Sequence, residues 1–359
     1  MSKEKMDNKF YSDDSPEYRI ASFVKDWYSC WGSVDQVHDD DFDFDHWNDM
    51  VQDVEGKHFV PGCLSGTRNS FSSIPDFDPS TEEIISVQAS QGYAVIVSKI
   101  AKQAMDEYHV YDVIQQGDGS WLIKKIITLL DPPEELVIAP TEVDKILALA
   151  SESASLQLLD DKLELDENLL FKKGRKILSS DIDDETPEIS FIGNFHTPSG
   201  ILGIMDFGDS IYEFEPLEHR VKPGHYKVEA VMADQRVGGI RILFKDDKKA
   251  VKWYSAKTPK GNGIYGVDAG NLAIFDVSSL TQLNNLKKER LFTQWSTSEG
   301  NPQLLNIHAH NDGIITSSGY GDGAYPAFWG VDENDNIVSL YIDFLVLVKE
   351  RKDGILITI

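Results

Sequence analysis

Three aspartates that lie beside glycine turns are the first residues of this sequence that could carry chemistry together. Asp268 and Asp276 flank "AGNLAIF", and Asp322 lies within "SSGYGDGAYP". If these turns converge in the fold, the carboxylates form a pocket in which one group acts as an acid and another as a base. Aspartates next to glycine more commonly accept hydrogen bonds from nearby backbone amides, so the sequence favours turn capping over chemistry.

The glycines of "SSGYGDGAYP" also raise the question of a phosphate-binding loop. Such a loop opens a helix and directs its backbone amides at the anion, often with a lysine nearby. Here Asp322 places a negative charge at the centre of the turn, and Pro326 leads into residues typical of a strand. The pattern therefore predicts a tight corner between strands, where glycine and aspartate are common.

His109 and Tyr111 are the acid-base candidates of the N-terminal half. They lie two residues apart in "EYHVYDVIQQ", whose alternation predicts a strand with both side chains on one face. Beneath an aromatic helix they could line an acid-base pocket of the isomerase kind. No nucleophile or cofactor motif accompanies them, so a core with a few polar residues is favoured, and we assign no catalytic residue.

Histidines and oxygen-rich segments do not predict a metal site. His308 and His310 in "NIHAHNDG" could share one face of a strand, but a site needs three or four ligands and no further cluster completes the set. The segment "DENDN" at residues 332–336 begins like a calcium loop, yet Ile337 stands where that loop needs glycine. We therefore expect neither a metal nor another cofactor.

An acidic segment is the candidate surface for a protein partner. Residues 35–55, "DQVHDDDFDFDHWNDMVQDVE", hold nine acids and no lysine or arginine, yet aromatic residues are interleaved among them. Apolar anchors among steering charges are typical of an interface. The predicted partner-binding residues are Asp39, Asp40, Asp41, Asp43, Phe44, Asp45 and Trp47. The alternative, in which Trp47 packs against the domain and the aspartates merely face water, remains open.

Patterns of helices and strands place these residues in two domains. In "SPEYRIASFVKDWYSCWG", Ser15 and Pro16 predict a helix start, and the apolar residues that follow share one helical face. Four strand-like runs follow between residues 82 and 130, the last two joined by "GDGS". Residues 15–133 are therefore predicted to form an α+β domain in which a curved antiparallel sheet covers the helix.

The rest of the chain is predicted to be a connector and a second domain. Residues 134–189 are acidic and are expected to form a mostly helical connector. Residues 190–350 contain many short strand-like runs with turn signals every 8 to 12 residues. This spacing indicates a mainly-β sandwich or a partly open barrel.

Both domains resemble known families. The aromatic helix, the antiparallel strands and the closing "GDGSWLIKKI" are similar to the nuclear-transport-factor-like cone fold. That superfamily includes isomerases, dehydratases, ligand-binding modules and bacterial toxin-immunity proteins, so the resemblance implies a fold rather than one activity. The second domain resembles a bacterial domain family of unknown function through four motifs. These are "YGVDAG" at 265–270, "GDGAYP" at 321–326, Trp329-Gly330 followed by Asp332, and "DFLVL" at 343–347. The genomic company of that family implies toxin immunity.

Charge and composition limit the classes of partner. Sixty acidic against 34 basic residues give a net charge of -26, which repels nucleic acids and anionic membranes. The basic clusters at 171–176 and 286–290 are short, and we find no concentrated basic patch in the sequence. A charged N-terminus without a long apolar run, and two cysteines without a CxxC spacing, lead us to expect a cytoplasmic protein with reduced thiols.

The sequence as a whole predicts a non-enzymatic bacterial protein that binds another protein. We expect an immunity-like factor whose acidic surface occludes a toxin with a basic active-site face. One alternative is a small-molecule-binding protein or enzyme that uses the cone pocket at His109 and Tyr111. A second is a structural adaptor. The partner's identity, the oligomeric state and the domain arrangement are left open by the sequence.

Removal of metal ions is expected to leave the melting temperature unchanged, because loss of a bound ligand would otherwise lower it. Dialysis against a chelator followed by thermal unfolding checks this, with untreated protein as the control. A drop of several degrees would reveal a metal near His308, His310 or residues 332–336.

Overall fold

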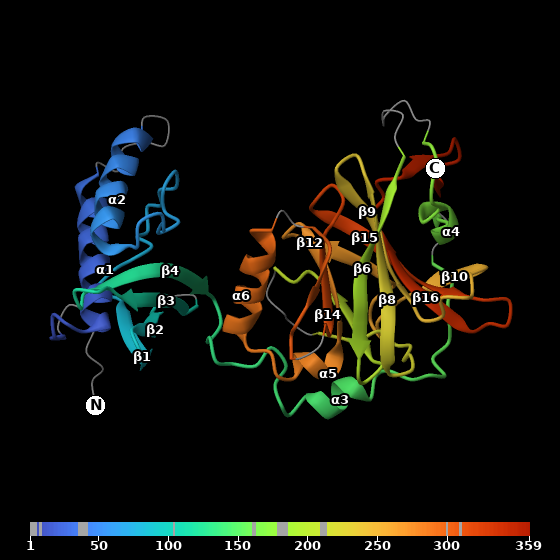
Figure 1. Ribbon diagram of the computed structural model, residues 1–359, viewed down its shortest axis with the longest axis horizontal. Helices are drawn as coiled ribbons and strands as arrows, with labels where there is room; N and C mark the ends of the chain where they lie inside the picture. Colours follow the sequence, from blue (N-terminus) through green and yellow to red (C-terminus); the bar gives the residue numbers. More distant parts are fainter. Residues whose placement is uncertain are drawn as a thin grey trace. The chain divides into compact units, whose positions relative to one another are not determined.

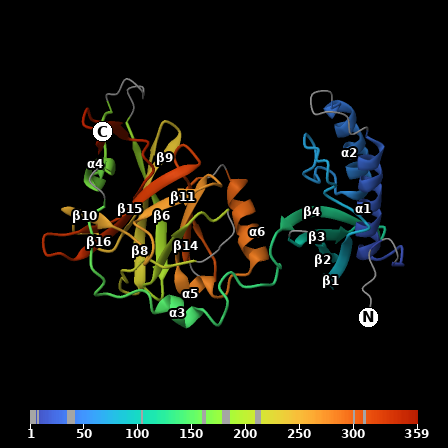
Figure 2. The same ribbon diagram turned by 180° about the vertical axis from the view of Figure 1, so that it is seen from behind.

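The protein is described by a computed structural model that covers residue 6 and residues 9–34, 42–102, 105–159, 163–177, 186–208, 214–298, 301–308 and 311–359. The chain divides into two compact units, Met1–Glu135 and Leu136–Ile359. Each is built from helices and mostly antiparallel sheets (Figures 1 and 2). In the described part of the chain, no helix has both the length and the apolar character needed to cross a membrane.

Two helices open the first unit, α1 (Pro16–Ser33) and α2 (Phe44–His58). The predicted start of α1 is confirmed, because the Ser15 hydroxyl accepts a hydrogen bond from the Tyr18 amide at 3.1 Å. Asp43 caps α2 in the same way, accepting from the His46 amide at 2.9 Å. A side-chain acceptor at this position satisfies an amide that has no partner within the helix.

The four predicted strands form one antiparallel sheet in chain order. They are β1 (Glu82–Ser90), β2 (Tyr93–Ile100), β3 (Glu107–Gln115) and β4 (Trp121–Leu129). The apolar stripes of both helices share one core with strand residues of this sheet. That core includes Ile20, Phe23, Val24, Trp27, Trp47, Val51, Ile96, Tyr111, Val113 and Ile123. The aromatic face read from the sequence of α1 is thus buried, and burial of this apolar surface is what stabilises the unit.

Two sheets form the body of the second unit. The larger one contains β6 (Glu188–Thr197), β8 (Gly224–Ala233), β9 (Arg236–Leu243), β10 (Lys252–Ser255), β11 (Ile264–Val267), β15 (Gly323–Val331) and β16 (Ile337–Asp343). The smaller one contains β7 (Leu202–Met205), β12 (Asn271–Asp276), β13 (Gln303–Leu305) and β14 (Gly313–Ser317). Every strand pair in both sheets is antiparallel, and among the described strands neither sheet closes into a barrel.

The smaller sheet is buried on both faces. All six residues of β12 are buried, and successive side chains point to opposite faces of a strand. Ile274 shares a core with Ile240 and Leu340 of the larger sheet. Phe275 belongs to a second core with α5 (Val277–Leu280) and α6 (Asn285–Ser296). The second unit is therefore layered as sheet, sheet and helices, which agrees with the predicted mainly-β architecture (Figure 1).

The segment predicted as a mostly helical connector is different in the structure. It is grouped with the second unit, and in its described residues the only helices are α3 (Val143–Leu147) and α4 (Glu167–Leu170). It also supplies β5 (Leu163–Glu164), which pairs in parallel with β18 (Leu356–Thr358) beside β17 (Val348–Glu350). Two of its leucines, Leu165 and Leu170, belong to the core that the two sheets share, whereas Leu149 and Leu158 are exposed.

The first unit is expected to fold by itself. Its helices and sheet bury one another, so a fragment of residues 1–135 should unfold in one cooperative transition. Near-ultraviolet circular dichroism during heating reports packing around its tryptophans. A fragment without a near-ultraviolet signal, or one that is digested rapidly by a protease that spares the intact chain, would contradict the prediction.

Candidate functional site

The side chains predicted to share one face of β3 lie in a buried polar cluster around Glu82. Glu82 opens β1 and accepts hydrogen bonds from the Ser98 hydroxyl at 2.5 Å and the Tyr111 hydroxyl at 2.6 Å. His109 Nδ1 lies 3.3 Å from the same carboxylate oxygen and 3.2 Å from the Tyr111 hydroxyl. Strand pairing explains this convergence, because β2 places Ser98 directly opposite His109.

The carboxylates near His109 favour its positively charged form. Its burial disfavours the charged form, but the charge of Glu82 and polar contacts with Glu107 and Glu82 outweigh burial and raise the pKa of His109 to about 9. Contact with His109 in turn lowers the pKa of Glu107 to about 2 against the effect of its burial. Burial, followed by the charge of Glu82, raises the pKa of Tyr111 well above its ordinary value. At neutral pH the cluster thus holds the imidazolium of His109, the neutral phenol of Tyr111 and the carboxylate of Glu107.

The cluster has the groups of an acid-base site but lacks access. Glu82 and Tyr111 are fully buried and His109 is 1% exposed. Phe77 covers the imidazole at 4.8 Å between ring centroids, and Phe23 packs edge-on against Phe77 at 4.9 Å. A substrate would reach these groups only if the core opened. The arrangement therefore fits a charged core cluster better than a reaction site.

The predicted partner-binding residues separate into two groups. Asp39, Asp40 and Asp41 lie outside the described residues. Asp43, Phe44 and Asp45 are at the exposed start of α2, where Phe44 is 43% exposed.

Trp47 was predicted to contact a partner, but it lies in the core of the first unit. It is 1% exposed, and its indole donates to the carbonyl of Ser70 at 2.9 Å and packs edge-on against Trp27. The correction has a simple cause: Trp47 lies on the inward face of α2, so its apolar surface is used in the core.

An acidic stripe on α2 was not recognised in the sequence as a helical feature. Asp45, Asp49 and Asp53 recur every fourth residue, so they lie in one row on the helix, and all three are exposed. Within the described ranges none of them forms an ion pair. Only Asp45 lies in the first turn, where the helix dipole favours a negative charge. The four-residue spacing was the signal that could have revealed the stripe.

The three aspartates of the second unit do not form one cluster. Asp276 is buried at the end of β12, accepts from the Thr197 hydroxyl at 2.5 Å and caps α5 through the Ser278 amide at 2.9 Å. Asp268 precedes β12 and is exposed, so the length of this strand separates it from Asp276 by roughly 17 Å. Asp322 is also exposed, beside Asp268, because β11 pairs Val267 with Gly323. Turn capping is the role that the structure shows for Asp276.

The "GDGAYP" segment is a corner between strands. Gly321 has φ +101°, and its carbonyl accepts from the Ser318 and Tyr325 hydroxyls at 2.9 and 2.8 Å. The strand β15 follows directly, with no helix to complete a phosphate loop. The interpretation as a tight corner is confirmed.

In the two segments considered as metal sites, "NIHAHNDG" and "DENDN", aspartate side chains accept local hydrogen bonds. Asp312 accepts from the amides of Ile307 and His308, and Asp332 accepts from the amides of Asn334 and Asn336. His310 lies outside the described residues. Among the residues that are described, no group of three or more His, Cys, Asp or Glu side chains could hold a metal ion.

A second buried carboxylate, Glu167, fixes α4 to the larger sheet. It accepts from Ser339 at 2.6 Å and from Trp253 and Arg241 at 3.2 Å each. Gly330 makes room for it, because a Cβ there would lie 2.2 Å from the Ser339 hydroxyl and 2.9 Å from a Glu167 oxygen. This contact gives the Trp329-Gly330 motif a packing role. Sequence reasoning missed it, since its members are far apart along the chain.

Comparison with known families locates a domain within the second unit. Residues 195–342 match a family described as "Protein of unknown function (DUF4241)". The chain carries a DUF4241 domain. Searches of curated proteins and of solved structures found no match. The DUF4241 domain includes Arg241, Trp253 and Ser339 but excludes Glu167, so the upstream segment supplies the carboxylate that binds these three side chains.

The pKa of His109 predicts that the first unit loses stability at high pH. An unfolded histidine titrates near 6.5 and His109 at about 9, so its contribution is complete below pH 6.5 and is lost as pH rises through 9. The loss should reach about 3 kcal/mol, since one pKa unit corresponds to about 1.4 kcal/mol. Urea unfolding of the wild type and of His109→Gln between pH 6 and 9.5 measures it. The free energies of the two proteins should converge at high pH, and a constant difference would disprove the assignment.

Proposed function

We propose that this protein acts by binding a second protein that carries a basic surface. The acidic stripe of Asp45, Asp49 and Asp53 is the observation that carries the proposal. Like charges four residues apart on a helix repel one another and destabilise the helix by a few tenths of a kcal/mol per pair. Cations of a partner would relieve this repulsion, because in the described structure the three carboxylates form no ion pair.

Phe44 supplies the apolar contact of the proposed surface. It lies at the start of α2 next to Asp43 and Asp45, and its ring packs edge-on against Phe42 at 4.8 Å. Aromatic side chains at the centre of an interface commonly provide much of the binding energy, while surrounding charges accelerate association. The exposed ring and its flanking carboxylates together suit docking on a cationic surface.

The biological role that best suits this surface is an immunity-like one. A bacterial, cytoplasmic factor with a net charge of -26 would be steered to a basic toxin domain and would block its active-site face. Support for this role comes from charge and from the resemblance of the first unit to cone-fold immunity proteins. An enzyme that uses His109 and Tyr111 is less well supported, because both side chains are enclosed.

Neutralising the stripe should slow association with the partner. The variant Asp45→Asn/Asp49→Asn/Asp53→Asn removes three steering charges, so the association rate at low salt should fall about three- to tenfold and depend less on ionic strength. A partner recovered from the native host on the immobilised wild-type chain is used in a stopped-flow salt series. The dissociation rate should change less than the association rate.

A charge-matched variant tests whether position matters. Asp13→Asn/Glu134→Gln/Glu135→Gln removes three exposed carboxylates elsewhere in the first unit, and it should retain the wild-type rates. Equal slowing in both variants would reduce the effect to net charge and would refute α2 as the docking surface. Unchanged kinetics in the stripe variant would refute it as well.

A further inference from the structure

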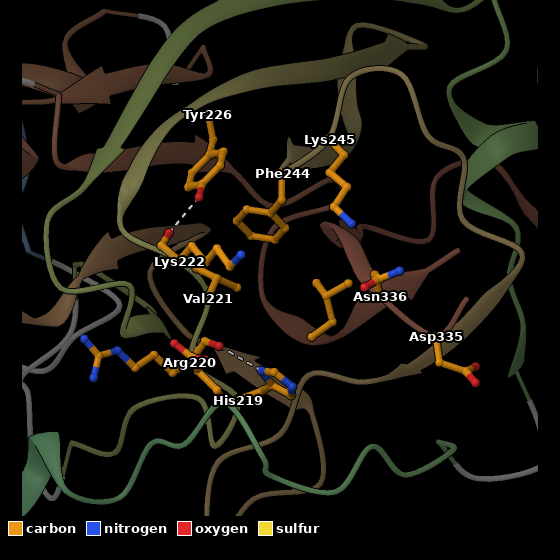
Figure 3. Close-up of a pocket in the computed structure, with 11 residues that line it drawn as sticks. His219, Arg220, Val221, Lys222, Tyr226, Phe244, Lys245, Asp335 and Asn336 are labelled. Carbon is orange, nitrogen blue, oxygen red and sulfur yellow. Dashed lines mark hydrogen bonds between the residues drawn. The ribbon is translucent and has the colours of Figure 1, made fainter. Parts of the chain in front are cut away.

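A cavity in the second unit gathers positive charge in a strongly acidic chain. Its volume is about 320 Å³, at the lower end of the range of small-molecule sites. Its lining contains three cations, two acids and three rings (Figure 3), which are Arg220, Lys222, Lys245, Glu152, Asp335, His219, Tyr226 and Phe244. The absence of a concentrated basic patch in the sequence thus gives an incomplete picture, because the fold collects cations that are separated along the chain.

In the described residues, the ammonium groups of Lys222 and Lys245 are not paired with the two acids that share the cavity lining, Glu152 and Asp335. Neither group forms an ion pair or a hydrogen bond there. Asp332 is influenced by the charge of Lys245, but its oxygens already accept from Asn334 and Asn336. In a chain with 60 acidic and 34 basic residues, acids are in excess, so two unpaired lysines at one cavity form a site with capacity for an anion.

Aromatic rings form a wall between these cations. Phe244 and Tyr226 meet edge-to-face, 4.9 Å between centroids, and both are half-buried. Figure 3 shows the two ammonium groups on opposite sides of the Phe244 ring, while the Arg220 guanidinium points away from it. The Tyr226 hydroxyl donates to the Lys222 carbonyl at 2.7 Å, which fixes the tyrosine ring. A planar ligand can pack on such a wall with its charge near the lysines.

His219 adds a directed acceptor. Its Nδ1 lies 3.0 Å from the Arg220 carbonyl, which can only accept, so this nitrogen carries the proton. Burial lowers the pKa of His219, against the opposing effect of the Arg220 carbonyl, and therefore favours the neutral ring. The neutral ring leaves Nε2 as an acceptor for a hydroxyl or amine of a ligand.

We propose that this cavity binds a nucleoside monophosphate, with the base against Phe244 and Tyr226 and the phosphate near the lysines that flank these rings, Lys222 and Lys245. The cavity has room for one ring system and one anionic group. Lysine ammonium groups are common phosphate ligands, and aromatic rings stack on any of the bases. This site lies in the second unit and is independent of the protein-binding surface proposed for α2.

A neighbouring cavity has lysines but no accessible aromatic ring. It also measures about 320 Å³ and carries Lys172, Lys173, Lys248 and Lys249. There the only aromatic ring, Phe171, is covered by the Arg241 guanidinium 4.2 Å from its centroid. It offers cations without a free ring face, so it serves as the internal control.

Equilibrium binding of defined probes tests the proposal. Calorimetry of the full chain at low salt uses the 5′-monophosphates of adenosine, guanosine, cytidine and uridine, together with ribose 5-phosphate and adenosine. At least one monophosphate should bind at least tenfold more tightly than ribose 5-phosphate, which lacks the base, and adenosine, which lacks the phosphate. Failure of all four to bind at 10 mM, or equal binding of ribose 5-phosphate, overturns the proposal.

Matched variants locate the binding. Lys222→Gln/Lys245→Gln should weaken the monophosphate at least tenfold and reduce its salt dependence. Lys248→Gln/Lys249→Gln removes the same amount of charge from the loop that carries Lys245 and should change affinity less than twofold. Phe244→Leu should weaken the monophosphate but not ribose 5-phosphate, with melting temperatures confirming the fold. Equal losses in the two lysine variants would place the anion elsewhere and overturn the proposal.

Discussion

Burial of carboxylates is the constraint around which both units are organised. An ionised carboxylate in a core is tolerated only when donors surround it, and removal of one donor leaves an uncompensated charge that costs roughly 3–5 kcal/mol. Glu167 meets this requirement with side chains from β9, β10 and β16. Glu82 meets it at one oxygen, Oε1, with side chains from β2 and β3, whereas its buried Oε2 accepts no hydrogen bond in the described structure. The strand registers are therefore fixed by charge as well as by apolar packing, because a shifted strand would withdraw a donor.

Much of the fold could be predicted because it depends on local pattern. The apolar spacing of α1 and the alternation of β3 determine which side chains face inward whatever lies opposite them. The region from 134 to 189 could not be predicted in this way. Leu165 and Leu170 pack in a core with strands that come later in the chain, and that tertiary contact overrides the local preference.

The candidate sites show the same limit more strongly. Periodicity placed His109 and Tyr111 on one face, but Glu82 could not be assigned to them, since it begins a strand 27 residues earlier. For the cationic cavity the missing information is a hairpin register. β8 and β9 pair Lys227 with Leu243, so the residues before β8 and after β9 meet at the open end of the hairpin. A net charge counted along the chain does not reveal that Lys222 and Lys245 line one cavity.

The parallel pairing of β5 with β18 has a consequence for the order in which the second unit assembles. The Asp166 amide donates to the Thr358 hydroxyl across 192 positions of sequence, and Leu163 lies opposite Leu356. On the ribosome, β5 emerges long before the strand that completes its sheet, and the donors of Glu167 also follow it. Closing so long a loop is slow, so β5 and α4 would spend much of synthesis undocked, where chaperones and proteases can reach them.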